Sequence, residues 1–204
     1  MDVIVPWQNP ALALALGYLL GSIPTGVILT RLAGAGDLRA LGSGSTGATN
    51  VLRTGRKGLA AATAIGDLLK GVAAVLAVRL IDADLAPLAA ISAVVGHCYP
   101  VWLRFAGGKG VATLMGVTVA LSLVAGLVFA VVWLGTVAAS RLSSLAGLLA
   151  AMSVPISFAL IPMWSEVMAG LFLAAVVLWR HRANIGRLMD GTEPRVGASA
   201  RAAK

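Results

Sequence analysis

The segment from Gly34 to Lys57, GAGDLRALGSGSTGATNVLRTGRK, combines glycines, hydroxyls and cationic side chains in a spacing that suits an anionic ligand. Successive peptide N–H groups in glycine-rich turns bind anions, and the arginine fork matches phosphate oxygens. We therefore predict a phosphate-binding loop here, with a solvated, positively charged linker as the alternative. The candidate binding residues are Gly42, Ser43, Gly44, Thr49, Asn50 and Arg53.

Gly42, Gly44 and Gly47 also spell the G-x-G-x-x-G fingerprint of dinucleotide-binding folds, and Asp67 follows 20 residues after the last glycine. That fingerprint requires a preceding strand and a surrounding βαβ unit, whereas long apolar runs lie on both sides of this one. We therefore expect no nucleotide cofactor, and no residue pattern predicts another cofactor or a metal.

A second segment, GHCYPVWLRFAGGKGVAT, places Lys109 after Gly107 and Gly108 at the start of an apolar run. It is not a Walker A loop, because that motif needs a glycine and a hydroxyl residue where this chain has Leu103 and Gly110. A lysine flanked by glycines at a helix N-terminus is nevertheless a good phosphate clamp, since the helix dipole favours anions. Gly107 and Gly108 are therefore also candidates for phosphate binding.

A third segment, HRANIGRL, follows the last apolar run and carries His181 together with Asn184 and Arg187, which are candidates for phosphate binding. A neutral imidazole here could accept a proton from a substrate. The alternative is a basic cluster that only anchors the helix to anionic lipid headgroups. His97 lies within an apolar stretch, so we interpret it as a hydrogen-bonded packing histidine.

Asp67 and Lys70 lie three residues apart within an apolar run and share one face of a helix. Charges at such a depth are costly unless they are paired or face a polar cavity. The pair is therefore either an internal ion pair or part of a binding site, and both residues are candidates for substrate binding.

Hydrophobic residues make up 59% of the 204 positions and charged residues 12%, which indicates a polytopic membrane protein rather than a soluble domain. The excess of 16 Lys and Arg over 8 Asp and Glu is better explained by the positive-inside rule than by nucleic-acid binding. The expected spans lie near 10–32, 58–80, 86–103, 111–140, 144–161 and 162–180, and the polar segments are 34–57, 104–110 and 181–204.

The run 111–140 is long for one span and short for two, with Ser122 and Gly126 as candidate breaks. One span there would put the glycine-rich segment and the basic C-terminal tail on opposite sides of the membrane. Two spans put every Lys and Arg except Arg79 on the same side. We therefore predict an all-α fold of about seven transmembrane helices, N-terminus out and C-terminus in, with six helices as the alternative.

The motifs GSIPTG, DLR…GSGSTGATNVLR, DLLKG, GHCYPV…GGKGVAT and HRANIGRL together resemble the bacterial acyl-phosphate-dependent glycerol-3-phosphate acyltransferases, the PlsY family. The resemblance extends over roughly residues 15–193 of one transmembrane acyltransferase domain, 1–204. It implies seven transmembrane helices in the bacterial cytoplasmic (inner) membrane and an active site that faces the cytoplasm. It also implies transfer of a fatty acyl group from acyl phosphate to the 1-hydroxyl of glycerol 3-phosphate, which gives lysophosphatidic acid and phosphate, the first step of phospholipid synthesis.

The resemblance implies Ser43, Lys109 and His181 as the catalytic residues, without metal or cofactor. Its implied partners are the two substrates, membrane lipid and an enzyme that produces acyl phosphate. Position 45 departs from the family, which often has Asn where this chain has Ser45. We expect direct transfer rather than an acyl-enzyme on Ser43, because the sequence places no His–acid pair beside that serine. An organophosphate transporter is the alternative function.

Overall fold

The computed structural model describes residues 8–42 and 44–197, and these residues form ten α-helices. Short 3-10 turns at Leu38–Ala40, Ala83–Leu85 and Val101–Leu103 connect some of them. The helices are α1 (Gln8–Gly21), α2 (Thr25–Leu32), α3 (Ala48–Leu52), α4 (Lys57–Arg79), α5 (Ala86–Cys98), α6 (Val111–Leu121), α7 (Leu123–Ser140), α8 (Ser143–Leu160), α9 (Trp164–Arg180) and α10 (Arg182–Met189).

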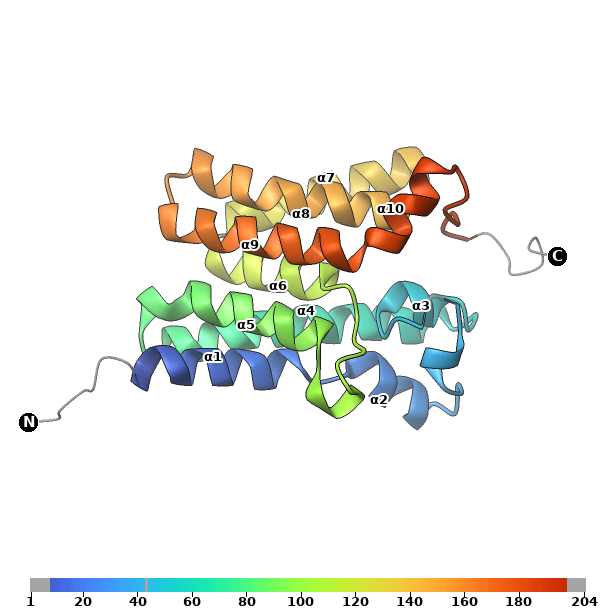
Figure 1. Cartoon of the computed structure of the whole chain (residues 1–204), viewed down its shortest axis with the longest axis horizontal. Helices are drawn as coiled ribbons and strands as arrows, with labels where there is room; N and C mark the ends of the chain where they lie inside the picture. The colour runs from blue at the N-terminus through green and yellow to red at the C-terminus, as the bar shows by residue number, and fades with distance from the viewer. Residues whose placement is uncertain (1–7, 43, 198–204) are drawn as a thin grey trace, which may run out of the picture.

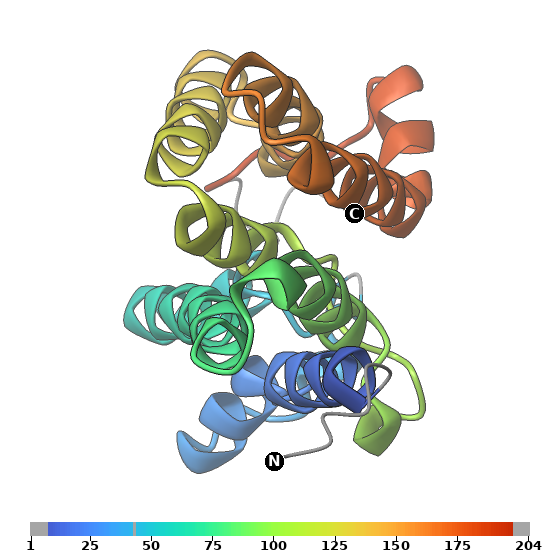
Figure 2. The same ribbon diagram turned by 90° about the vertical axis from the view of Figure 1, so that its left-hand side faces the viewer.

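The long helices run side by side in two groups, α1, α4 and α5 in one and α7, α8 and α9 in the other, with α6 between them (Figures 1 and 2). Small residues let the helices approach closely. A Cβ at Gly17 or Gly21 would overlap α5, and one at Gly116 would overlap the backbone of Leu68 in α4. Gly17 and Gly21, spaced as a G-x-x-x-G pair, therefore allow α1 to pack closely against α5.

The apolar core lies between the two helix groups and joins α4, α5, α6, α7, α8 and α9. Its largest fully buried side chains are Leu114, Phe129, Phe158 and Leu173. Many other large apolar side chains point outward, among them Val131 at 70% and Leu134 at 61% exposure. An apolar interior together with an apolar exterior is the pattern expected of a protein that is surrounded by lipid.

Within residues 8–42 and 44–197, five helical stretches are long and apolar enough to cross a membrane: Asn9–Leu32, Lys57–Arg79, Ala83–Leu103, Leu123–Ser140 and Ser143–Leu160. The apolar helix α6 has 11 residues and rises only about 16 Å, roughly half of the hydrocarbon core. The all-helical fold is confirmed, whereas the count of seven crossings and the orientation stay predictions.

The run 111–140 breaks at Ser122, one of the two positions suggested by the sequence. Ser122 has extended backbone angles (φ −152°, ψ 119°), and its hydroxyl accepts the N–H of Ala125 at 3.3 Å as the cap of α7. Helices α6 and α7 then lie side by side (Figure 2). This run is therefore two helices and not one long tilted span.

Candidate active site

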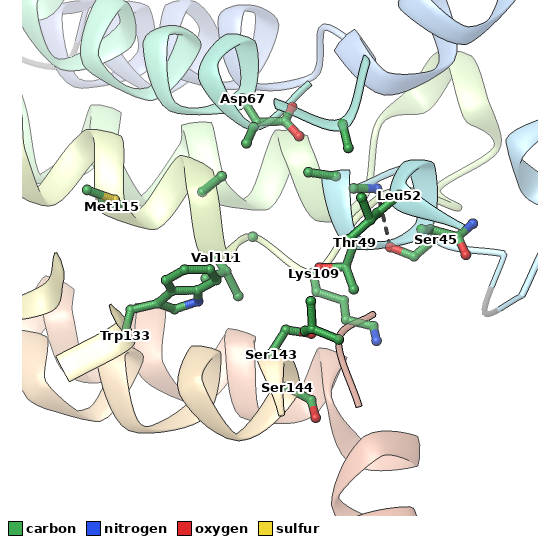
Figure 3. A pocket seen from close by; sticks show the side chains of 18 of the residues that line it. Ser45, Thr49, Leu52, Asp67, Lys109, Val111, Met115, Trp133, Ser143 and Ser144 are labelled. Atoms are coloured by element: carbon green, nitrogen blue, oxygen red, sulfur yellow. Dashed lines mark hydrogen bonds between the residues drawn. The ribbon is translucent and has the colours of Figure 1, made fainter. Parts of the chain in front are cut away.

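The three polar segments meet at one end of the helix bundle, around a cavity of about 440 Å³. Its polar walls come from α3, the loop before α6, and the chain from His181 onward. Figure 3 shows Ser45 and Thr49 on one side of Lys109, while Met115 and Trp133 lie in the opposite direction. The polar lining includes Ser45, Thr49, Asn50, Arg53, Lys109, His181, Asn184 and Glu193, and the apolar lining includes Ile65, Leu68, Met115, Phe129, Trp133 and Val137.

A second hollow of about 470 Å³ adjoins the polar end of this cavity. The two share Ser45, Lys109 and Asn184 in their walls. The second hollow adds Gly44 and three arginines, Arg180, Arg182 and Arg187, so its surroundings are strongly cationic. The site therefore has a cationic polar end and an apolar arm that runs between helices.

Lys109 stands where the two hollows meet. Its Nζ donates to Asn184 Oδ1 at 2.6 Å. Burial is the main reason that the pKa of Lys109 falls to about 8, and the carboxylate of Glu193 opposes that fall. The ammonium is therefore mostly protonated at pH 7 and close to its titration range, which suits a group that binds an anion.

The loop that carries Lys109 is fixed by its own backbone. Gly107 N donates to Cys98 O at 3.2 Å, and Gly108 N donates to His97 O at 3.1 Å. A Cβ at Gly108 would overlap the His97 imidazole, so glycine is needed for this close approach. Both peptide N–H groups, predicted to bind substrate, thus donate within the protein, and the binding role of these glycines stays a prediction.

Gly110 follows Lys109 and has φ +87°, a left-handed conformation that strains any other residue. This conformation turns the chain directly into α6, so Lys109 lies just before the helix N-terminus. The predicted placement of Lys109 at the start of an apolar helix is confirmed.

The glycine-rich segment folds over the start of α4. Leu38, Val51 and Ala60 form a small buried cluster that anchors it. Asn50 is buried and donates from Nδ2 to Leu38 O at 2.9 Å and to Leu41 O at 3.0 Å. These bonds close the loop around residues 42–49.

Several predicted loop residues gather at the cavity. Thr49, Asn50 and Arg53 line it. Gly42 has φ +52°, and a side chain there would overlap the Arg53 guanidinium. The structure therefore brings the arginine and the glycine turn together, while Ser43 lies outside the described residues.

His181 is 3% exposed, and its Nδ1 lies 2.8 Å from Val177 O. Because a carbonyl can only accept, Nδ1 carries the proton and Nε2 is left as the acceptor nitrogen. Burial lowers the pKa of His181 to about 4, so the imidazole is neutral at pH 7. His181 lines the cavity beside Lys109 and Asn184, as the sequence predicted.

Glu193 was not singled out in the sequence, yet its carboxylate organises the cationic end. Oε1 accepts from Asn184 Nδ2 at 2.6 Å and Oε2 from Arg187 Nε at 2.7 Å. Burial raises the pKa of this carboxyl, and the hydrogen bonds from Asn184 and Arg187 help to lower it below its usual value. An acidic residue in a basic tail was the only available signal, since spacing does not show that the chain turns back here.

Asp67, Lys70 and His97 form a separate buried cluster. Asp67 Oδ1 lies 2.8 Å from Lys70 Nζ and 3.4 Å from His97 Nδ1, and it also accepts from the Thr25 hydroxyl. Lys70 Nζ donates to Ile23 O at 2.8 Å as well. Asp67 and His97 border the cavity, but Lys70 is not among the lining residues. The pair therefore has the geometry of an internal ion pair.

Comparison with known proteins identifies the family. The sequence model of the glycerol-3-phosphate acyltransferase family matches residues 11–191. The chain belongs to this family. It is 56% identical to the glycerol-3-phosphate acyltransferase of Rhodopseudomonas palustris (strain BisB5), over 91% of this chain and 95% of that protein. It is 51% identical to that of Roseobacter denitrificans, over 92% and 96% of the two chains.

The fold is likewise that of a glycerol-3-phosphate acyltransferase. The crystal structure of PlsY (YgiH), an integral membrane glycerol 3-phosphate acyltransferase, in its glycerol 3-phosphate form superposes with a TM-score of 0.87 at 35% identity. The alignment covers 92% of this chain and 96% of that one. The resemblance inferred from the motifs is thus confirmed, and the protein is an integral membrane acyltransferase of phospholipid synthesis.

Proposed function

We propose that this protein transfers a fatty acyl group from acyl phosphate to the 1-hydroxyl of glycerol 3-phosphate. The observation that carries the proposal is the shape of the cavity, in which one cationic end meets one apolar arm at Lys109 and His181. Two phosphate-bearing substrates need the cationic end, and a fatty chain needs the arm. Membership of the family supports glycerol 3-phosphate as the acceptor, and we propose acyl phosphate as the donor.

The apolar arm suits the acyl chain. Its walls are α4, α6 and α7, and they carry Leu68, Met115 and Trp133 among others. Helix α6 packs against both α4 and α7. Burying methylene groups stabilises the bound donor by about 0.8 kcal/mol each, so even part of a fatty chain would contribute substantially to binding.

The cationic end would bind the two phosphate groups. Lys109, Arg53 and Arg187 supply positive charge, and Ser45 and Thr49 supply hydroxyl donors. Asn184 already exchanges hydrogen bonds with Lys109 and Glu193, and a phosphate oxygen could replace either contact. These positive charges offset the mutual repulsion of two anions bound side by side, and binding at fixed positions aligns hydroxyl and carbonyl for reaction.

In the proposed reaction the 1-hydroxyl oxygen attacks the acyl carbonyl carbon. A new carbon–oxygen ester bond forms, the bond between the carbonyl carbon and the phosphate oxygen breaks, and phosphate leaves with that electron pair. The hydroxyl proton passes to a phosphate oxygen, which is a better base than an imidazole with a pKa of about 4. His181 Nε2 orients the hydroxyl, and Lys109 stabilises the developing negative charge.

We propose further that the site faces the cytoplasm, with the N-terminus outside and seven crossings. The clustering of the basic segments at one end, together with the positive-inside rule, supports this orientation. Single cysteines at positions 45 and 196, introduced after Cys98→Ala, should both react with an impermeant thiol reagent only from the cytoplasmic side. Labelling from opposite sides would overturn the topology.

The proposed activity is tested with purified protein given palmitoyl phosphate and glycerol 3-phosphate, with palmitoyl-CoA as the control donor. We expect lysophosphatidic acid and phosphate in equal amounts from acyl phosphate, and no product from the thioester. Product from palmitoyl-CoA alone would replace the proposed donor. No product from folded protein, together with uptake of glycerol 3-phosphate into vesicles, would favour the transporter.

A further inference from the structure

The guanidinium of Arg180, the last residue of α9, lies against the loop that carries Lys109. Its Nε donates to Gly108 O and its Nη2 to Gly107 O, each at 3.0 Å. The guanidinium carbon also lies 5.0 Å from the centroid of the Tyr99 ring. The arginine is therefore held by one aromatic face and two consecutive carbonyls, all outside its own helix.

The two peptide units before Lys109 are held from both sides. The N–H groups of Gly107 and Gly108 donate to the end of α5, and their carbonyls accept from Arg180 in α9. Two glycines in a row would otherwise leave this backbone with great conformational freedom. A planar fork that grips adjacent carbonyls removes that freedom, and a lysine cannot reproduce this geometry.

We propose that Arg180 is a positioning residue, which holds the Gly107–Gly108 backbone so that Lys109 points its ammonium into the junction of the two hollows. This inference rests on the role proposed above for Lys109. The Nε and Nη2 atoms of Arg180 are bonded to the loop carbonyls, although the residue also lines the second hollow. In this proposal its effect on catalysis passes through the placement of Lys109, and the test must separate that effect from direct contact with a substrate.

The test compares Arg180→Gln, which removes fork and charge, with Arg180→Lys, which keeps the charge. Arg104→Gln is the matched control, because Arg104 is an exposed cation of the same loop and lines neither hollow. A misplacement of about 1 Å can cost about 100-fold in rate. We expect kcat to fall about 10- to 100-fold in both Arg180 variants, with a smaller change in KM for glycerol 3-phosphate. In the Arg104→Gln control, kcat should change less than about twofold.

The pH profile separates placement from charge. Glu193 raises the pKa of Lys109, whereas Arg187, Arg53 and Arg180 lower it. Loss of the Arg180 charge should therefore move the alkaline limb of kcat/KM to higher pH in Arg180→Gln. In Arg180→Lys the limb should stay in place while kcat still falls, which a role through charge alone would not produce.

Each contrary result has a distinct meaning. Normal kcat in Arg180→Lys would show that only the charge matters, and a raised KM with normal kcat would make Arg180 a substrate ligand. An equal loss in Arg104→Gln, or normal activity per folded molecule with a lowered melting temperature, would also overturn the proposal. Failure of the proposed function is recognised separately, because wild-type protein would then make no lysophosphatidic acid and Lys109→Ala would change nothing.

Discussion

The molecule contains two clusters of charged side chains that differ in their surroundings. In the first, Asp67, Lys70 and His97 are each at most 7% exposed and bond to one another and to neighbouring helices. In the second, Lys109 and the Glu193–Arg187 pair border open hollows, and the Arg187 side chain is 37% exposed. Asp67 and His97 also border the cavity, but the first cluster has its partners within the helix bundle, whereas the second has contacts that a ligand can replace.

This difference indicates which charges hold the fold together and which act on substrate. A buried charge that loses its partner is strongly destabilising, because its desolvation is no longer offset. Removing the protein partner of a charge at the wall of a cavity destabilises the fold much less, since solvent or a ligand can take the place of that partner. Substitutions in the first cluster should therefore lower stability, and substitutions in the second should change activity.

The largest effect is expected for Asp67→Asn, which leaves the buried Lys70 ammonium without its counter-ion. We expect a loss of about 3–5 kcal/mol in the free energy of unfolding, measured by denaturant titration in detergent. The double variant Asp67→Asn/Lys70→Met should recover part of that loss. Stability close to wild type in the single variant would mean that the ion pair does not hold the helices together.

Lys109→Ala should lower activity and leave stability unchanged, in contrast to Asp67→Asn. Removing a group that stabilises developing charge typically costs about 100- to 1000-fold in kcat. We expect at least about 100-fold slower formation of lysophosphatidic acid, with an unchanged unfolding midpoint. A variant that retains normal turnover would remove Lys109 from the catalytic group.

The pH dependence of the wild-type enzyme should reflect the Lys109 ammonium. Because its pKa is lowered to about 8, the protonated form is present at pH 7 and is lost as pH rises through that value. We expect kcat/KM to fall about tenfold per pH unit well above pH 8. A flat profile up to pH 10 would contradict the assignment of this charge.

The smallest effect is expected for Glu193→Gln, which removes one charge from the second cluster. The carboxylate raises the pKa of Lys109, so its loss should lower that pKa and move the alkaline limb to lower pH. Gln keeps an oxygen that can accept from Asn184, so the fold should persist. A shift of the limb to higher pH would show that Glu193 does not act on Lys109.

Much of this organisation could be predicted from sequence. The apolar runs located the long helices, the charge asymmetry required the break that Ser122 provides, and the glycine-flanked Lys109 marked the centre of the site. The three-residue spacing of Asp67 and Lys70 fits an internal ion pair and a substrate-binding pair equally well. Only the helices that surround the two residues decide which it is, and the sequence does not show them.

The contacts of Arg180 and Glu193 were beyond sequence reasoning for a different reason. Arg180 bonds to residues 72 and 73 positions away, and Glu193 reaches Asn184 only because the tail folds back after α10. Neither contact follows from helical periodicity. The break that ends α6, in contrast, lies at Ser122, one of the two positions that the sequence suggested.

The most direct test of the account is calorimetric titration of glycerol 3-phosphate into purified wild-type, Lys109→Ala and Asp67→Asn/Lys70→Met protein, with glycerol as the uncharged control. We predict saturable binding of glycerol 3-phosphate to wild type and no binding of glycerol. The affinity should fall at least about tenfold in Lys109→Ala and change little in the double variant. Equal binding by wild type and Lys109→Ala, or loss of binding only in the folded double variant, would contradict the assignment of the phosphate site to the cluster around Lys109.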